Sequence, residues 1–185
     1  VAVTQDSASA HALEADLSAL IEPGVPVLHF PDWETLPYDL FAPHPDIVSQ
    51  RIATLYRLPS VTRGVLVVPI ATLMQRLPPL RFIADRVLML KRGDRLDLER
   101  ESQRLEQAGY RRVGQVIEPG DFAIRGSLLD LYPAGAATPY RIELLDDEID
   151  TLRAFDPETQ RSAGAVERIE LLPAREFPFE EPDQR

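Results

Sequence analysis

The feature that most constrains the fold is an uninterrupted apolar run at residues 65–70, Val-Leu-Val-Val-Pro-Ile. A strand with this pattern has no polar face, which is typical of a strand buried on both sides in a parallel sheet. A shorter apolar run predicts a second strand at 25–30, and leucine spacing predicts helices at 9–21 and 46–58. Strands that alternate with helices predict a parallel α/β arrangement for residues 1–80.

A loop rich in aromatic residues and proline follows the predicted strand at 25–30. It spans residues 30–46 and contains Trp33, the only tryptophan of the chain. Neither helical nor strand periodicity fits it, and a loop of this composition either packs against a core or grips a partner. We expect Asp46 to cap the next helix, and we interpret His44 and its neighbours as a structural cap.

The pattern changes near Pro78, and strand signals dominate the rest of the chain. One amphipathic helix is predicted at 97–108, ended by Gly109. The last apolar segment, 166–172, is either a final strand or the return to the first domain. The strands are predicted at 86–91, 113–118, 122–132, 140–145 and 149–155. The fold class is therefore α/β, a partial parallel α/β domain followed by a small α+β domain with an antiparallel sheet.

Composition limits the class of function. The net charge is −10 at pH 7, which argues against broad, non-specific nucleic-acid binding. Cysteine is absent, so disulfides and thiolate chemistry are excluded, and no apolar run approaches 18 residues. These features fit a cytoplasmic protein without a membrane partner. The chain begins at Val1 without methionine, and we expect it to be a fragment of a longer protein.

The sequence carries no catalytic motif. The only lysine, Lys91, is not part of a Gly-Lys-Ser/Thr phosphate loop, and no Gly-x-Gly-x-x-Gly occurs. None of the three histidines belongs to a zinc-binding motif, and no serine lies in a nucleophile motif. The acidic stretch at 146–150 lacks the spacing of a calcium loop and is interpreted as an exposed hairpin tip. We therefore expect no catalytic residue, cofactor or metal in this chain.

A candidate partner-binding patch lies in residues 140–145, where side chains alternate between the two faces of a strand. Arg141, Glu143 and Leu145 are expected to face outward, because their neighbours are apolar. On a nearby strand the same alternation turns Arg125 outward. Two arginines, a carboxylate and an exposed leucine on a rigid sheet resemble an interface hot spot. An ordinary solvated sheet face remains the alternative.

Several ordered motifs carry a family resemblance. They include Asp-Trp-Glu-Thr-Leu-Pro-Tyr-Asp at 32–39, Gly-Val-Leu-Val-Val-Pro at 64–69, Arg-Gly with Leu-Leu-Asp at 125–130, and Asp-Asp-Glu-Ile-Asp at 146–150. Through them the chain resembles the N-terminal module of the bacterial transcription-repair coupling factors, over residues 25–178. That module is similar to the excision-repair protein UvrB.

The resemblance implies a domain organisation. Residues 1–85 would be part of a helicase-like, UvrB-like domain 1a, and residues 86–173 would be a domain 2 that binds UvrA. Residues 174–185 would be a linker or the start of domain 1b. The aromatic loop would then belong to the scaffold of the helicase-like domain. ATP is implied as a cofactor only for the full-length protein, whose motor lies elsewhere in the chain.

The resemblance also implies partners and site residues. The UvrA-contacting positions of the family fall on Arg125 and Arg141, with Glu143 nearby, and Leu145 stands where relatives carry an aromatic side chain. A C-terminal domain of the full-length protein would mask this surface until the motor engages stalled RNA polymerase on DNA. The alternative function is direct DNA binding by a UvrB-like domain. No aromatic hairpin insertion supports that alternative, and the net charge opposes it.

Overall fold

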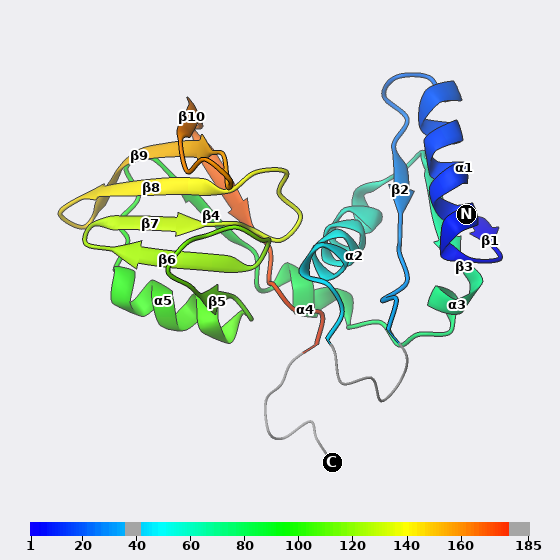
Figure 1. Cartoon of the computed structure of the whole chain (residues 1–185), viewed down its shortest axis with the longest axis horizontal. Coiled ribbons are helices and arrows are strands. Elements are labelled where there is room, and N and C mark those ends of the chain that lie inside the picture. The colour runs from blue at the N-terminus through cyan, green and yellow to red at the C-terminus, as the bar shows by residue number, and fades with distance from the viewer. Residues whose placement is uncertain (36–41, 178–185) are drawn as a thin grey trace, which may run out of the picture.

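The computed structural model describes residues 1–35 and 42–177, without the side chain of Leu80. The middle of the aromatic loop, including Tyr38 and Phe41, and residues 178–185 of the predicted linker lie outside the described residues. Figure 1 shows two units side by side, one built on a short parallel sheet and the other on a larger, mainly antiparallel sheet. The mixed α/β class predicted from the sequence is thereby confirmed.

The first unit contains a three-stranded parallel sheet in the order β1-β3-β2. Its strands are β1 (Ala2–Thr4), β2 (Val27–His29) and β3 (Val65–Pro69). The central strand is the apolar run, and its Val67 and Val68 are fully buried. The predicted parallel pairing is confirmed, because a strand without a polar face is stable only when both faces are covered.

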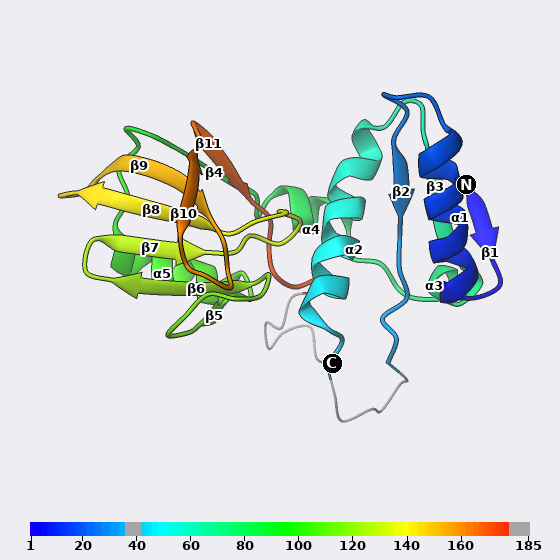
Figure 2. The same ribbon diagram turned by 45° about the horizontal axis from the view of Figure 1, so that its top comes forward.

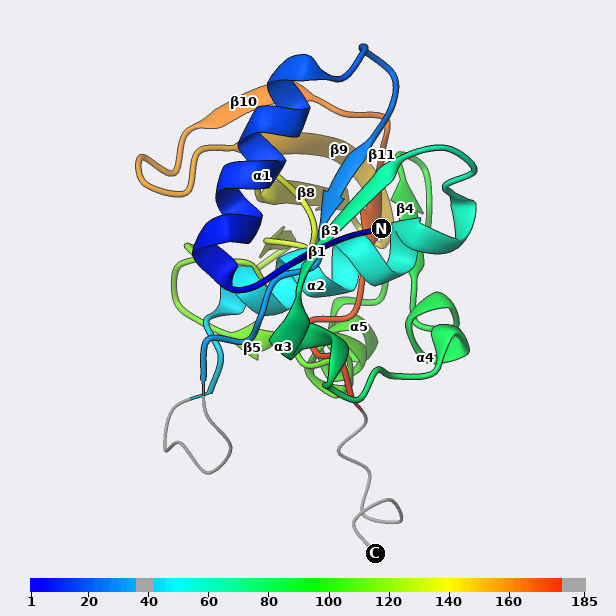
Figure 3. The same cartoon turned by 90° about the vertical axis from the view of Figure 1, so that its right-hand side faces the viewer.

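Helices cover both faces of this sheet. The views in Figures 2 and 3 place β2 and β3 between helix α1 (Ser7–Leu20) and helix α2 (Pro45–Arg57). The N-cap of α2 is His44, not Asp46 as predicted: the His44 ring Nδ1 accepts a hydrogen bond from the Asp46 backbone N–H at 3.3 Å. Asp46 lies in the first turn instead, where its charge complements the helix dipole.

Two short helices follow β3. Helix α3 (Ile70–Leu73) begins directly after the strand. Helix α4 (Leu80–Ala84) was not predicted from the sequence, and its Phe82 and Ile83 are buried in the core of the first unit. A 3₁₀ turn, η1 (Leu58–Ser60), ends α2. Such short helices lack a full amphipathic repeat, so tertiary packing decides them.

The second unit is built on a six-stranded sheet in the order β10-β9-β8-β7-β6-β5, antiparallel except for the β5–β6 pair. The strands are β5 (Arg111–Arg112), β6 (Asp121–Arg125), β7 (Leu128–Leu131), β8 (Tyr140–Leu145), β9 (Glu148–Phe155) and β10 (Ser162–Ala165). The strands predicted at 140–145 and 149–155 are confirmed, and the acidic residues between them form an exposed tip.

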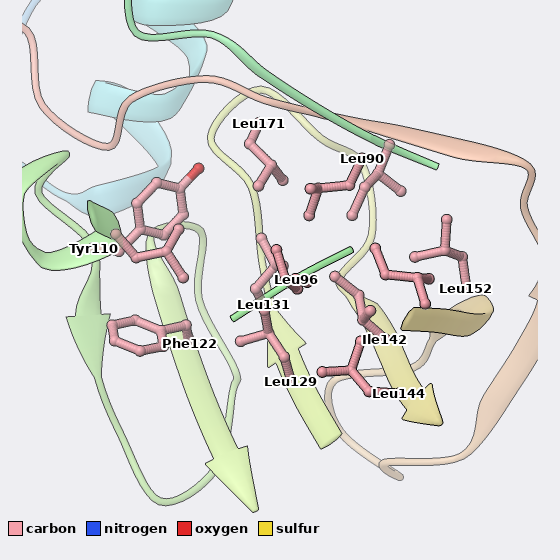
Figure 4. Packing of buried hydrophobic residues seen from close by; sticks show 13 residues of the cluster. Leu90, Leu96, Tyr110, Phe122, Leu129, Leu131, Ile142, Leu144, Leu152 and Leu171 are labelled. Atoms are coloured by element: carbon pink, nitrogen blue, oxygen red, sulfur yellow. The ribbon is translucent and has the colours of Figure 1, made fainter. Parts of the chain in front are cut away.

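One face of this sheet packs on helix α5 (Leu98–Gln107) and on an antiparallel pair formed by β4 (Leu88–Lys91) and β11 (Arg168–Leu171). Figure 4 shows aliphatic side chains of β7, β8 and β9 directed toward Leu90 and Leu171 of that pair, beside Tyr110 and Phe122. The helix predicted at 97–108 is confirmed: the Asp97 carboxylate accepts hydrogen bonds from two backbone N–H groups of the first turn.

Two strand predictions need correction, and one strand was not predicted. Residues 113–118 form no strand, because the Asp121 carboxylate accepts the backbone N–H groups of Ile117 and Glu118 and holds them in a turn. Residues 122–132 are not one strand but the hairpin β6–β7, which reverses at Gly126 with a φ of 61°. Strand β10 was missed because its four residues are all exposed and carry no apolar pattern.

The chain returns to the first unit after β11. Leu172 packs with Phe30 and Ile52 in the core of the first unit, and Glu176 forms a buried ion pair with Arg51 of α2. From the second unit, the backbone N–H of Gly135 donates a hydrogen bond of 2.7 Å to the hydroxyl of Ser49, also on α2. Residues far apart in the sequence therefore connect the two units.

A buried histidine, His29, connects the sheet to α1. His29 of β2 is buried, its Nδ1 lies 2.8 Å from a Glu14 carboxylate oxygen, and its ring meets that of His11 edge-on at 4.7 Å. The Nε2 atom is buried without a hydrogen-bond partner among the described residues. Burial lowers the pKa of His29, with a further lowering by His11, and Glu14 opposes both effects.

We expect acid to destabilise the chain through His29. The folded-state pKa lies below the ordinary value, so the unfolded chain binds this proton more tightly and the free energy of unfolding falls as pH drops below about 6.5. Urea unfolding between pH 8 and pH 5 should show a steeper loss for the wild-type chain than for His29→Gln. The exposed, non-titrating variant Gln50→Ala serves as control and should keep the wild-type slope. Equal slopes for all three chains would contradict the expectation.

Candidate partner-binding face

The face of the six-stranded sheet that points away from α5 carries the predicted patch. Strand register places Ala123 of β6, Asp130 of β7 and Arg141 of β8 side by side on this face. The alternation predicted for β8 is present, because Ile142 and Leu144 belong to the core on the opposite side. We call the group Arg125, Asp130, Arg141, Glu143 and Leu145 the outer patch.

Asp130 organises the outer patch. Its side chain is 0% exposed and accepts hydrogen bonds from two arginines. Arg141 binds it in a bidentate manner, with Nε 2.7 Å from Oδ1 and a terminal nitrogen 2.9 Å from Oδ2, and Arg125 donates to Oδ2 at 2.5 Å. A buried carboxylate is stable only with such partners. Sequence reasoning missed Asp130, although one charged residue within the apolar strand Leu-Leu-Asp-Leu was a signal.

Arg141 is largely committed to the fold. Its side chain is 16% exposed, its guanidinium also donates to the Gln160 carbonyl at 3.3 Å, and it lies 4.9 Å from the centre of the Phe155 ring. Hydrogen bonding to the Asp130 carboxylate raises the pKa of Arg141. These contacts fix one guanidinium in place on the sheet, with an exposed edge of limited area.

Arg125 is the more accessible arginine. It is the last residue of β6, next to the turn at Gly126, and its side chain is 52% exposed. One terminal nitrogen binds Asp130, which leaves the remaining N–H donors of the guanidinium for another acceptor. Arg125 is therefore oriented by the protein and still able to bind a carboxylate of a partner.

Glu143 and Leu145 complete the outer patch toward the β8–β9 turn. The hydroxyl of Thr151 donates a hydrogen bond of 3.0 Å to Glu143, and Asp130, not Glu143, is the carboxylate bonded to both arginines. Leu145 is 70% exposed, which is a large apolar exposure for a residue on a rigid strand. The four residues predicted from the sequence thus lie on neighbouring strands of one face, with Asp130 between the arginines.

A hollow of about 420 Å³ opens beside the arginines. It is lined by Gly114, Gln115, Arg125, Leu128, Arg141 and Gln160. The loop that precedes β6 forms one side of it, so the segment wrongly predicted as a strand contributes to the surface. A side chain that entered this hollow would meet two guanidinium groups, which favours a carboxylate.

The described residues give no sign of a metal or membrane site. Within residues 1–35 and 42–177, no group of three or more His, Asp or Glu side chains is arranged to hold a metal ion. The helices in those same ranges are all too short or too polar to cross a membrane. Arginines, a carboxylate and an exposed leucine thus lie together on one face of the sheet, a combination that also occurs in interface hot spots.

Comparison with known proteins identifies related sequences for the whole chain. Residues 88–177 match the family model of the UvrB interaction domain. The chain is 49% identical to the transcription-repair-coupling factor of Haemophilus influenzae over 98% of the chain and 54% identical to that of Escherichia coli K12 over 82%. The Bacillus subtilis protein is 31% identical over 95% of the chain.

Residues 88–177 therefore belong to the UvrB interaction domain family, and the chain as a whole is homologous to one segment of the transcription-repair-coupling factors. The resemblance inferred from the sequence motifs is confirmed. The chain spans only 13–16% of the length of these three relatives.

Proposed function

We propose that this chain is a recruitment module that binds UvrA through the outer patch. In the full-length protein it would link RNA polymerase stalled at a lesion to nucleotide excision repair. The single observation that carries the proposal is Arg125, a half-exposed guanidinium at the end of strand β6 that is held by the buried Asp130. Arginines presented in this way are frequent hot spots in protein interfaces.

The chain itself would be non-catalytic. It has no phosphate loop, so ATP binding, translocation on DNA and contact with RNA polymerase would belong to other parts of the full-length protein. The first unit would be the incomplete helicase-like domain and would act as a scaffold that holds the second unit. A C-terminal domain of the full-length protein would cover the outer patch until the motor is engaged, and the whole protein would act in the cytoplasm.

Leu145 sets the apolar part of the proposed interface. Relatives are expected to carry an aromatic side chain at this position, and leucine buries less area and offers no ring contact. We therefore expect the affinity for UvrA to depend more on the arginines in this chain than on the residue at position 145. The exposed leucine still removes apolar surface from water when a partner covers it.

Replacement of Leu145 tests the proposal. Leu145→Asp is expected to weaken UvrA binding by about tenfold or more. The leucine would be covered by UvrA in the complex, and the substitution places a charged carboxylate in that apolar contact. Isothermal titration calorimetry would compare it with the wild-type chain and with Leu20→Asp, a matched change at an exposed leucine of the first unit. Circular dichroism would confirm that all three chains are folded. Failure of the wild-type chain to bind UvrA would refute the proposal.

A second measurement distinguishes direct DNA binding from the proposed binding of UvrA. A gel-shift assay at low salt, where electrostatic binding is strongest, should show no complex with duplex or single-stranded DNA. A chain with a net charge of −10 would need a concentrated basic surface to bind DNA, and the outer patch pairs its two arginines with an acidic residue. A retarded band that disappears in Arg125→Ala would favour the UvrB-like alternative.

A further inference from the structure

A second, larger groove lies at the end of the second unit where β8 turns into β9. It has a volume of about 970 Å³ and is separate from the hollow beside Arg125. Its walls come from β4, from residues 94–101 with Arg104, and from Leu144, Asp146 and Asp147. In Figures 1 and 2 this end of the second unit, with α5 and the β8–β9 turn, points away from the first unit.

A buried carboxylate lines this groove. Glu101 of α5 is only 6% exposed, and its Oε1 atom is buried without a hydrogen-bond partner among the described residues. Its other oxygen lies 4.0 Å from a terminal nitrogen of Arg104, too far for a hydrogen bond. Burial raises the pKa of Glu101. A buried carboxylate without donors costs stability, and the fold gains nothing from it as a cap because Asp97 already caps α5.

The rest of the groove combines apolar walls with an acidic rim. Leu90, Leu96 and Leu144 supply apolar surface, and carboxylates from the β4–α5 segment and the β8–β9 turn outnumber the three lining arginines by two to one. One of those arginines, Arg95, is already paired with Asp147 at 3.8 Å. Apolar walls that end at a carboxylate suit the long aliphatic stem and charged head of an arginine or lysine.

We propose that this groove binds a basic segment of a partner protein, and that Glu101 receives a guanidinium or ammonium group from it. The incoming cation supplies the donor that Oε1 lacks, and its stem packs on the leucines. The groove is lined by α5 and β4, whereas the outer patch lies on the sheet face that points away from α5, so the binding of a basic segment here does not rest on the proposed function.

A short peptide tests the proposal without UvrA. The ¹⁵N-labelled chain would be titrated with acetyl-Leu-Arg-Leu-amide and, as an uncharged match, with the same peptide carrying citrulline in place of arginine. We expect amide shifts confined to residues 88–104 and 144–147, and binding at least fivefold weaker for the citrulline peptide. Glu101→Gln should weaken arginine-peptide binding by a similar factor. Glu106→Gln, an exposed change on the same helix outside the groove, should leave it unchanged.

The melting temperature of Glu101→Gln at pH 7 distinguishes a binding role of Glu101 from a structural one, because the two roles predict changes of opposite sign. Glu101→Gln removes a buried charge whose Oε1 atom has no hydrogen-bond donor among the described residues, so its melting temperature should exceed that of the wild-type chain by a few degrees. A lower melting temperature would show that Glu101 supports the fold and would overturn the proposal, as would shifts elsewhere or equal affinity for both peptides. If the wild-type chain bound the arginine peptide but did not bind UvrA, only the proposed function would be refuted.

Discussion

Glu176→Ala is expected to lower the free energy of unfolding by about 3–5 kcal/mol, the cost of breaking a buried ion pair from one side. Arg51 is 0% exposed, and both its Nε and one terminal nitrogen donate to the Glu176 carboxylate. Its other terminal nitrogen donates to the Pro31 carbonyl, and the Phe30 ring centre lies 4.2 Å from the guanidinium. Without Glu176 a full positive charge remains buried and lacks its counter-ion.

Urea unfolding would measure this loss, with two comparisons. Glu167→Ala, at an exposed site before β11, should change stability by less than about 0.5 kcal/mol. The double replacement Arg51→Met with Glu176→Leu should recover much of the loss, because two apolar side chains leave no unpaired charge. A loss below about 1 kcal/mol for Glu176→Ala would show that this pair does not connect the returning segment to α2.

Arg125→Ala and Arg141→Ala are expected to separate binding from folding. Arg125→Ala should weaken UvrA binding by about 2 kcal/mol or more, about 30-fold, and should destabilise the chain less than Arg141→Ala does, because Asp130 keeps its bidentate partner. Arg141→Ala should weaken binding as well, and should also destabilise the chain by about 1–3 kcal/mol, because Asp130 loses its bidentate partner.

Calorimetry with UvrA and urea unfolding would be run on the same samples. Arg168→Ala, at an exposed position of β11 outside the outer patch, serves as the matched control and should alter neither quantity. Equal losses of stability for Arg125→Ala and Arg141→Ala would contradict the distinction drawn from their exposure. Unchanged affinity in Arg125→Ala would remove the main support for the outer patch.

Local sequence patterns were sufficient to predict those helices and strands whose buried face is set by the spacing of their own apolar residues. The apolar run at 65–70 predicted the central strand β3, and the leucine spacing with Asp97 predicted α5. Strand alternation in β8 placed Arg141 and Leu145 on the face opposite the core. In each case the side-chain period along one segment decides which face is buried, and that period is a property of the sequence.

The tertiary structure decided everything that depends on distant partners. Asp130 became the centre of the outer patch only because strand pairing places it beside Arg141 and near Arg125, and the length of β5 and the turn after it depend on Asp121. Arg51 finds its counter-ion 125 residues further along the chain. Sequence by itself determined the central strand β3, the helix α5 and the two faces of β8, because these follow local periodicity. Which charges meet was set by folding, because burial forces each charged group to find a partner wherever the chain brings one.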